Sequence, residues 1–405
     1  MDIDKTIVPT TVLHWNYRGF TEFPLSELES DGSDVTDIYL KENLITKLPS
    51  SISVLEQLES LYLSGNDITE LPKEISKLRY LKCLDVSGNR LRNIPDEIGE
   101  ARSLKFLILD ENELTELPLR IAELRSLRYL SVCDNKLEWL PQKPVYNYFH
   151  CEFRFWRNPN LKSLPYSLWY HMFRNQQTRS LNIGCLNITS TKPIGRCKIK
   201  LNHHNEIKEH IIPCPSQYQN VVDYKSNSPP SLFEICNRLF YDLIDRTVRK
   251  LNNQIENFKC YADFPDEYEN DRVQILDENF KEFNINSELK SPAFDENGNQ
   301  FDVSPTTKNI SKQNKSYYVP AEVIDDYYSF MPKFLKTDLS NGPISRCENS
   351  GCKKPVFNYV HYEFSFGKLI LIDKTEDVLL SAAFCSKSCS DIWQRGKSTI
   401  QWTLA

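Results

Sequence analysis

The sequence of 405 residues predicts an α/β protein: a solenoid of 23-residue units, then a helical segment, then a small α+β module built around four cysteines. Three observations support this prediction. An asparagine recurs every 23 residues, a helical pattern follows Ser228-Pro229-Pro230, and two close cysteine pairs lie near the end. The expected segments are the solenoid at 1–170, an extension over its end at 171–227, the helical segment at 228–270, an acidic insert at 271–316 and the C-terminal module at 317–405.

The repeated asparagine stands in a constant apolar context. Its six copies are Asn43, Asn66, Asn89, Asn112, Asn135 and Asn158. An apolar pair precedes each copy at one spacing, as Leu84 and Val86 precede Asn89, and Leu-Pro or Ile-Pro follows most copies. This pattern resembles the leucine-rich-repeat superfamily, whose units each supply a short strand and gain stability by stacking. We expect the Asn side chains to hydrogen-bond turn backbone, and each Pro to begin the convex side.

The variable strand positions are expected to face the concave side of the solenoid. Large or charged residues occupy them, namely Tyr39, Tyr62, Asp85, Phe106, Ile108, Asp110, Tyr129, Arg154 and Trp156, with Asp134 and Arg157 nearby. Tyr, Trp and Arg often anchor protein interfaces, so this surface is predicted to bind a protein target. The alternative is that some positions, such as Phe106 and Tyr129, are half-buried strand edges.

The stretch 169–224 loses the repeat period. Its potential metal ligands are Cys185, Cys197, His203, His204, His210 and Cys214. Their spacing is irregular, and no close pair anchors a zinc site. We therefore expect this stretch to cover the end of the solenoid instead.

A helical pattern begins after Pro229-Pro230. Leu232, Ile235, Cys236 and Leu239 fall on one face at helical spacing, which is equally typical of an amphipathic core helix. Residues 261–302 include twelve acidic and three basic side chains, and residues 296–315 are mostly polar. We therefore expect the insert at 271–316 to be acidic and partly disordered.

The segment Ser231-Leu232-x-x-x-Cys236 resembles the elongin-binding box of ubiquitin-ligase substrate receptors. The resemblance implies that Leu232 enters an elongin C pocket and that the small Cys236 permits close approach, with Leu239 on the same face. The box departs from the family where Phe240 replaces an aliphatic residue. Further on, Phe264, Pro265 and Tyr268 resemble the cullin-selecting pattern of an apolar residue, Pro, two variable residues and another apolar residue.

Two cysteine pairs, Cys347 with Cys352 and Cys385 with Cys389, flank an alternating stretch at 356–372. Gly367-Lys368 is the expected turn of a hairpin, and Ser390-Asp391-Ile392-Trp393 is expected to be helical. Knuckle, hairpin and helix are typical of small zinc modules, and a structural zinc could supply ~10 kcal/mol of folding free energy. The alternatives are four reduced, buried cysteines, or His361 as a replacement ligand.

The order of these parts resembles the leucine-rich repeat-containing protein 58 group and its relatives of the 28 type. Cys347 to Phe357 and Phe384 to Cys389 support the resemblance together with the solenoid and the Pro-Ser-Leu helix. It weakens over 169–224 and fails around 270–315. It implies a non-catalytic substrate receptor of a cullin–elongin ubiquitin ligase, with elongin B, elongin C and a cullin as partners.

Composition argues against several other classes of protein. The net charge of −6 disfavours a general nucleic-acid binder, and no run of about 18 apolar residues predicts a membrane span. The first residues lack a secretory pattern, so we expect a cytoplasmic location, with the nucleus as a further one. Without a phosphate-binding Gly-rich loop or a nucleophile elbow, no enzyme is predicted. The alternative function is a signalling scaffold in a small GTPase or phosphatase pathway.

Overall fold

The computed structural model describes residues 11–27, 34–145, 147–148, 150–174, 177–178, 197–203, 206–212, 218, 220–222, 229–254, 324, 328–371, 375–397 and 400–404. The chain divides into two compact units, Met1–Tyr241 with Phe330–Ala405, and Asp242–Ser329. The first unit contains both the repeats and the four cysteines.

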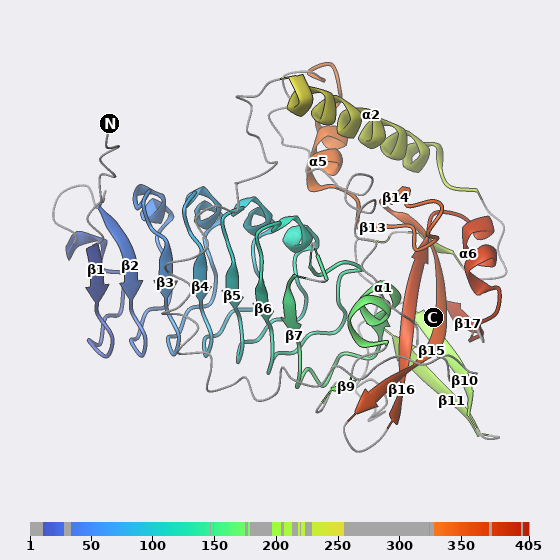
Figure 1. Ribbon diagram of the computed structural model, residues 1–405, viewed down its shortest axis with the longest axis horizontal. Coiled ribbons are helices and arrows are strands. Elements are labelled where there is room, and N and C mark those ends of the chain that lie inside the picture. Colours follow the sequence, from blue (N-terminus) through green and yellow to red (C-terminus); the bar gives the residue numbers. More distant parts are fainter. Residues whose placement is uncertain are drawn as a thin grey trace, which may run out of the picture. The chain divides into compact units, whose positions relative to one another are not determined.

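Seven parallel strands follow one another in sequence order and form one sheet (Figure 1). They are β1 Thr11–His14, β2 Val35–Tyr39, β3 Ser60–Tyr62, β4 Cys83–Asp85, β5 Phe106–Ile108, β6 Tyr129–Ser131 and β7 Glu152–Arg154. Their register follows the repeat, since Leu61 lies opposite Leu84 and Leu84 lies opposite Leu107. The expected solenoid is therefore confirmed.

The repeated asparagines hydrogen-bond the turns between neighbouring units, as expected. Asn112 Oδ1 accepts from the backbone amide of Leu91 at 2.9 Å, and its Nδ2 donates to the carbonyls of Val86 and Leu109 at 3.0 and 3.1 Å. The other inner copies repeat this set of contacts. Each buried amide thus satisfies backbone groups that strand pairing leaves without a partner.

Short 3₁₀ helices lie opposite the strands. They are η1 Leu25–Glu27, η2 Ser50–Val54, η3 Lys73–Lys77, η4 Asp96–Glu100 and η5 Leu119–Glu123. A proline precedes each of the last four, at Pro49, Pro72, Pro95 and Pro118. Proline fits because its fixed φ suits the start of a helix and its missing N–H would have no helical acceptor.

The end of the solenoid passes into the C-terminal module through α1 Tyr166–Leu168 and η6 Trp169–Phe173. The strands of the module are β8 Leu164–Pro165, β9 Gln177–Thr178, β10 Cys197–His203, β11 Glu206–Ile212, β12 Asn220–Val222, β13 Ser345–Arg346, β14 Pro355–Val356, β15 Tyr359–Leu371, β16 Thr375–Phe384 and β17 Trp402–Leu404. Its helices are α2 Leu232–Gln254, α5 Lys333–Asn341 and α6 Lys387–Gln394.

Strands β15 and β16 form the centre of this module. Leu369, Val378 and Leu380 from these strands extend the buried core of the repeats. Strand β8, at the end of the repeats, pairs in parallel with β16 at Leu380 and Ser381. The module therefore covers the apolar end that the last repeat would otherwise expose.

Segment 171–227 was expected to form an extension over the end of the solenoid. Its residue Phe173 packs in the core of the repeats, and its described strands join the sheets of the module. Strand β10 pairs with β11 and β17, and β12 and β9 both pair with β15. These pairings connect residues far apart in the sequence, which is why local patterns gave no sign of them. Of the potential ligands in this segment, Cys185, His204 and Cys214 lie outside the described residues.

Gly367-Lys368, the expected turn, lies inside β15 instead, where Gly367 is paired with Val378. A Cβ atom at Gly367 would approach Leu380 Cδ1 to 2.6 Å and Trp169 Cε2 to 2.8 Å. The glycine is therefore explained by close packing of Trp169 on the strand, since Gly serves for close approach as well as for turns. None of the helices in the described parts of the chain is both long and apolar enough to cross a bilayer.

Candidate functional site

The residues between the core positions of the strands line one side of the parallel sheet, which we call the strand face. Near its beginning three rings stack in register: His14 on Tyr39 at 4.9 Å and Tyr39 on Tyr62 at 4.6 Å between ring centroids. Burial raises the pKa of both tyrosines, so they remain neutral hydrogen-bonding groups. This stack is a rigid, amphipathic platform of the kind found in protein interfaces.

The middle of the strand face is polar. Asp85 lies 3.6 Å from the Lys41 ammonium, and Asp110 Oδ1 accepts from Ser131 Oγ at 2.6 Å and from the Cys133 amide at 2.7 Å. Burial raises the pKa of Asp110, and the nearby carboxylates Asp134 and Asp85 add to the shift. These carboxylates are held in fixed positions by the strands.

The last strands bring cations and aromatic rings together. The Arg154 guanidinium lies over the Tyr129 ring at 5.3 Å and 2.6 Å from Glu152 Oε1, while Arg157 pairs with Asp134. Trp156 packs edge-on against Phe173 at 6.4 Å between ring centroids. Tyr129, Arg154 and Trp156 are partly exposed, so these contacts restrict their side-chain conformations while leaving them accessible at the surface.

The structure places all nine predicted strand-face residues along β2 to β7 or directly after these strands. Eight of them are partly exposed, while Asp85 is only 7% exposed and is largely covered by its neighbours. Phe106 and Tyr129, for which the alternative was half-buried strand edges, are half-buried, so their burial fits both interpretations. Binding of a protein target at this face remains a prediction.

The helix α2 begins as the sequence predicts, with Ser231 Oγ accepting from the Glu234 amide at 3.2 Å. Its first turns bury polar side chains. The Glu234 carboxylate, 0% exposed, accepts from the amides of Phe357 and Asn358 at 3.1 and 2.9 Å and pairs with Arg238 at 2.6 Å.

Apolar side chains lie on the opposite side of the same turns. Leu232 is 76% exposed and Leu239 64% exposed, and Ile235 and Phe233 are exposed as well. Cys236 on this side is partly buried. Because the polar side is buried and the apolar side is exposed, packing within the described unit does not explain the apolar stripe.

A second exposed aromatic group adjoins this stripe. Phe233 stacks with Phe334 of α5 at 6.1 Å between ring centroids, and Phe334 and Phe330 are 62% and 74% exposed. We call the combined surface the apolar face; its members are Leu232, Phe233, Ile235, Leu239, Phe330 and Phe334.

The predicted cullin-selecting residues Phe264, Pro265 and Tyr268 lie outside the described residues. The same spacing of apolar residues and Pro occurs at Met331-Pro332-x-x-Leu335. Pro332 is the N-cap residue of α5, and Met331 and Leu335 are buried. The spacing also occurs in the repeats, as at Leu71-Pro72-x-x-Ile75, so it does not by itself identify a cullin-binding segment.

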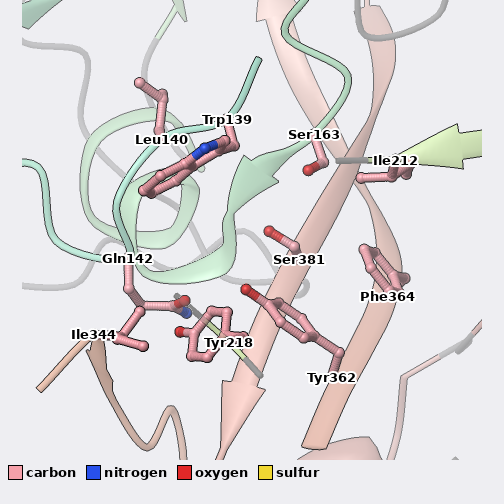
Figure 2. A pocket seen from close by; sticks show the side chains of 10 residues that line it. All are labelled: Trp139, Leu140, Gln142, Ser163, Ile212, Tyr218, Ile344, Tyr362, Phe364 and Ser381. Carbon is pink, nitrogen blue, oxygen red and sulfur yellow. The ribbon is translucent and has the colours of Figure 1, made fainter. Parts of the chain in front are cut away.

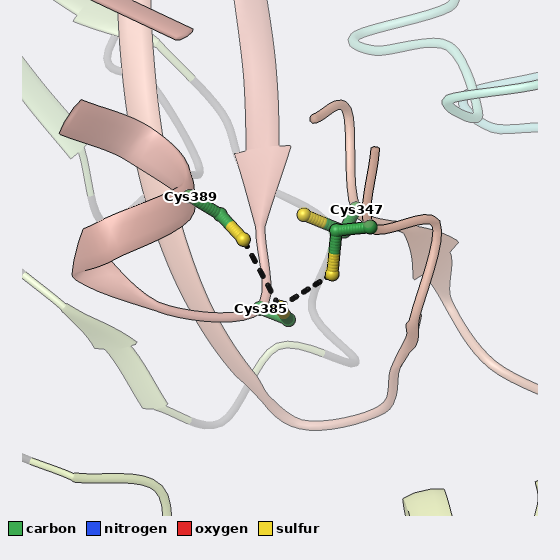
Figure 3. Close-up of side chains that lie close together, drawn as sticks. Cys347, Cys385 and Cys389 are labelled. Carbon is green, nitrogen blue, oxygen red and sulfur yellow. Dashed lines mark hydrogen bonds between the residues drawn. The ribbon is translucent and has the colours of Figure 1, made fainter. Parts of the chain in front are cut away.

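The four predicted cysteines come together, and Figure 3 shows three of them, Cys347, Cys385 and Cys389. Cys347 follows β13, Cys385 follows β16, and Cys389 lies in the first turn of α6. The four Sγ atoms all lie within 4.8 Å of one another; Cys385 Sγ is 3.5 Å from Cys352 Sγ and 3.8 Å from Cys389 Sγ. Tetrahedral zinc with Zn–S bonds of about 2.3 Å places its sulfurs about 3.8 Å apart, so this cluster fits such an ion.

The thiols of the cluster share their hydrogen bonds unequally. Hydrogen bonds from the neighbouring thiols, first of all Cys347, lower the pKa of Cys385 to about 5, whereas the hydrogen bond to Cys385 and burial raise the pKa of Cys347, and burial raises that of Cys352 to about 11. Among the described residues, His361 is not part of the group. Its Nε2 lies 3.3 Å from the Tyr359 hydroxyl, and burial lowers its pKa to about 4. The geometry therefore favours four sulfur ligands over the His361 alternative.

The loop that contains Cys347 and Cys352, and the helix α6 that contains Cys389, also contact the end of the solenoid. Glu348, next to Cys347, bonds to the Gln142 side chain, and the Trp393 ring of α6 packs edge-on against Tyr166 at 4.9 Å. Near Gln142, a cavity of about 20 Å³ is lined by residues that include Trp139, Tyr362 and Ser381 (Figure 2). It has room for about one water molecule, so it is not a ligand pocket.

A parallel sheet of 23-residue units with an internal asparagine ladder defines a repeat protein of the α/β solenoid class. Residues 36–156 match the family described as leucine-rich repeat. Solenoids of stacked repeats present extended concave binding surfaces.

Several solved structures share the repeat. A leucine-rich-repeat protein of Leptospira interrogans is 25% identical over 40% of this chain and 48% of its own, with a TM-score of 0.28. InlP of Listeria monocytogenes is 29% identical over 30% of this chain and 33% of its own, at 0.26. A plant peptide hormone receptor in complex with RGF2 is 26% identical over 32% and 21%, at 0.29.

These scores are too low to carry a functional inference, and this chain covers about half or less of each of those three chains. The comparison with curated proteins finds no match.

Proposed function

We propose that this protein is a non-catalytic recognition adaptor that serves as a substrate receptor of a cullin–elongin ubiquitin ligase in the cytoplasm. In this proposal the strand face binds the target and the apolar face binds the ligase subunits. The ligase partners perform the chemistry.

The observation that supports the ligase assignment is the exposure of Leu232. In an elongin-binding box this leucine must leave the body of the receptor and enter a pocket of elongin C. Leu232 is 76% exposed in the first turn of α2, while Glu234 beside it is buried. If α2 were an ordinary core helix, the burial of these two residues would be reversed.

In this proposal, elongin C and the cullin bind neighbouring parts of the apolar face. Leu232 and Leu239 would contact elongin C, with the partly buried Cys236 allowing close approach. Phe334 and Phe330 would contact the cullin, because both are exposed and Phe334 stacks on Phe233 of α2. Burying exposed aromatic and aliphatic side chains of this size contributes roughly 1.5–3 kcal/mol each.

We further propose that the four cysteines bind one structural zinc ion. A site with four protein ligands leaves no position for a substrate, so the ion would stabilise the module and take no part in catalysis. Cys347, Cys352, Cys385 and Cys389 would supply these ligands.

Co-purification with elongin B and elongin C tests the proposal. Wild type should capture both, and Leu232→Asp should lose capture because a carboxylate cannot enter an apolar pocket without a large desolvation cost. Ile392→Asp is the matched control, since Ile392 is also an exposed aliphatic residue on a helix. Trp156→Ala on the strand face is a second control, and both controls should retain capture.

If folded wild-type protein captures neither elongin, the ligase assignment fails. The remaining function is then that of a leucine-rich-repeat scaffold, for example in a small GTPase or phosphatase pathway, whose partners would be sought through the strand face.

A further inference from the structure

One buried ion pair of α2 connects to both cysteine loops. The Glu234 carboxylate accepts the amides of Phe357 and Asn358, which follow the loop containing Cys347 and Cys352. The Arg238 guanidinium donates to the carbonyl of Cys385 itself at 3.0 Å. The first turns of α2 are therefore held by backbone groups that follow the loop with Cys347 and Cys352, and by the backbone of Cys385.

The Arg238 guanidinium makes a third contact, to the carbonyl of Tyr359 at the start of β15 at 3.1 Å. The Arg238 side chain is 11% exposed and that of Glu234 is 0% exposed. A buried pair of charges is tolerated only while its surrounding hydrogen bonds remain, because each ion has given up its hydration. Displacing these backbone groups would therefore remove the conditions under which Glu234 and Arg238 can stay buried.

Those backbone positions depend on the cluster. Cys385 is a predicted metal ligand, and its carbonyl also accepts the hydrogen bond from Arg238. The Cys347 amide donates to the Lys354 carbonyl at 2.9 Å, which closes the loop that contains Cys347 and Cys352. The two loops are joined by contacts between the sulfurs, which all lie within 4.8 Å of one another, and by a hydrogen bond from the Glu348 amide to the Ala383 carbonyl at 2.9 Å. A bound ion would fix both loops, and with them the contacts of α2.

The exposed leucines lie on the same turns as the ion pair. Leu232 precedes Glu234 by two residues, and Leu239 directly follows Arg238. Any displacement of Glu234 and Arg238 would therefore move the apolar face relative to α5, where Phe233 meets Phe334.

We propose that Glu234 and Arg238 are positioning residues that make the apolar face dependent on metal binding at the four-cysteine cluster. The metal-bound cluster holds the two loops, the loops hold the ion pair, and the ion pair sets the position of Leu232 and Leu239. The identity of the docking partner rests on the proposed function, whereas the coupling within this chain does not.

Hydrogen–deuterium exchange on the full chain tests the coupling, with one sample zinc-loaded and another stripped by a chelator. Removing the metal should raise exchange about tenfold or more in peptides covering 232–241 as well as in those covering 345–358. Peptides from the repeats at 84–112 should not change, which shows that the chain remains folded. Unchanged exchange in 232–241 while the cysteine loops open would overturn the proposal.

Arg238→Met separates the helix contact from metal binding. This variant should keep one zinc per chain by metal analysis, yet exchange faster over 232–241 even when loaded. Arg238→Lys keeps the charge and should restore part of the protection, which a purely space-filling role would not predict. Arg246→Met, at an exposed arginine of the same helix, is the matched control and should behave as wild type.

Elongin capture adds a second readout. Chelation and Arg238→Met should each reduce capture at least about tenfold, and Arg246→Met should not. Normal elongin capture by the metal-free chain would overturn the coupling while leaving the ligase assignment intact. Absence of capture by wild type, with metal-dependent exchange in 232–241, would overturn only the ligase assignment.

Discussion

The repeats and the C-terminal module are held together in different ways. In the repeats, every unit contacts its neighbours through the same strand pairing and the same buried asparagine, as Asn112 does with Leu91 and Leu109. In the module, local hairpins such as β15 and β16 are joined by strands from distant segments, as β10 pairs with β17. Repetition thus stabilises one region, while single long-range contacts stabilise the other.

This difference determines how far a local change spreads. A defect in one repeat weakens two interfaces and leaves more distant units in place, because stability is a sum over neighbours. A defect in the cysteine cluster reaches β16, α6 and α2 together, since Cys385, Cys389 and Arg238 meet there. The two regions should therefore respond differently to matched perturbations.

Metal removal should have the largest effect and should be confined to the module. Structural zinc contributes ~10 kcal/mol or more in small domains, so chelation should open the region around residues 345–400. Limited proteolysis should then cut within this region while a fragment spanning 34–145 survives. If both regions resist proteolysis equally with and without chelator, the module does not need a metal ion at the cysteines to stay folded.

Asn112→Ala should cost about 3 kcal/mol of unfolding free energy, because it leaves the buried amide of Leu91 and the carbonyls of Val86 and Leu109 without their partner. Urea unfolding of the repeats measures this cost. Asn160→Ala is the control, since Asn160 makes a single long contact of 3.5 Å to the Lys136 carbonyl. Similar losses in both variants would contradict the role of the ladder.

Gly367→Ala should destabilise the module by about 2 kcal/mol, because the new methyl would press on Leu380 and Trp169 in a packed core. Gly351→Ala serves as the comparison, since its Cβ would meet only Asn349 Oδ1 at 3.7 Å. Thermal unfolding of the two variants should separate them by several degrees. Equal unfolding midpoints for the two variants would mean that β15 shifts enough to accommodate the methyl group of the Gly367→Ala variant.

Asp110→Asn should have the smallest effect, a change in pH dependence. The folded-state pKa of Asp110 is raised by burial, so its contribution to stability is present below the unfolded pKa of about 3.9 and is lost as pH rises through the folded value. The variant should therefore gain thermal stability relative to wild type as pH rises above about 4. A constant difference above this pH would contradict the assigned shift.

The sequence predicts the repeats well because each unit repeats its signal. The spacing of Asn43 to Asn158 and the apolar pairs before them specify strand, register and core together. The four cysteines were also predictable, since close pairs are a local signal of metal binding. Their convergence within 4.8 Å needed the structure.

The rest depended on contacts that no local pattern records. Gly367 suggested a turn, but glycine is required at this position because the ring of Trp169, almost 200 residues earlier in the sequence, packs against the strand. Glu234 and Arg238 look like an ordinary surface pair at helical spacing, and they are buried because Phe357, Asn358 and Cys385 supply their partners. Periodicity placed Leu232 and Leu239 on one face without showing that this face is exposed.

Native mass spectrometry of the full chain mixed with elongin B and elongin C tests the central claim, that one region of the molecule recognises a target and the other docks a ligase through a metal-supported helix. We expect one complex containing a single copy of each protein and one zinc ion, and its loss in Leu232→Asp but not in Trp156→Ala. A folded chain that carries no metal and remains alone in the presence of both elongins would contradict the claim.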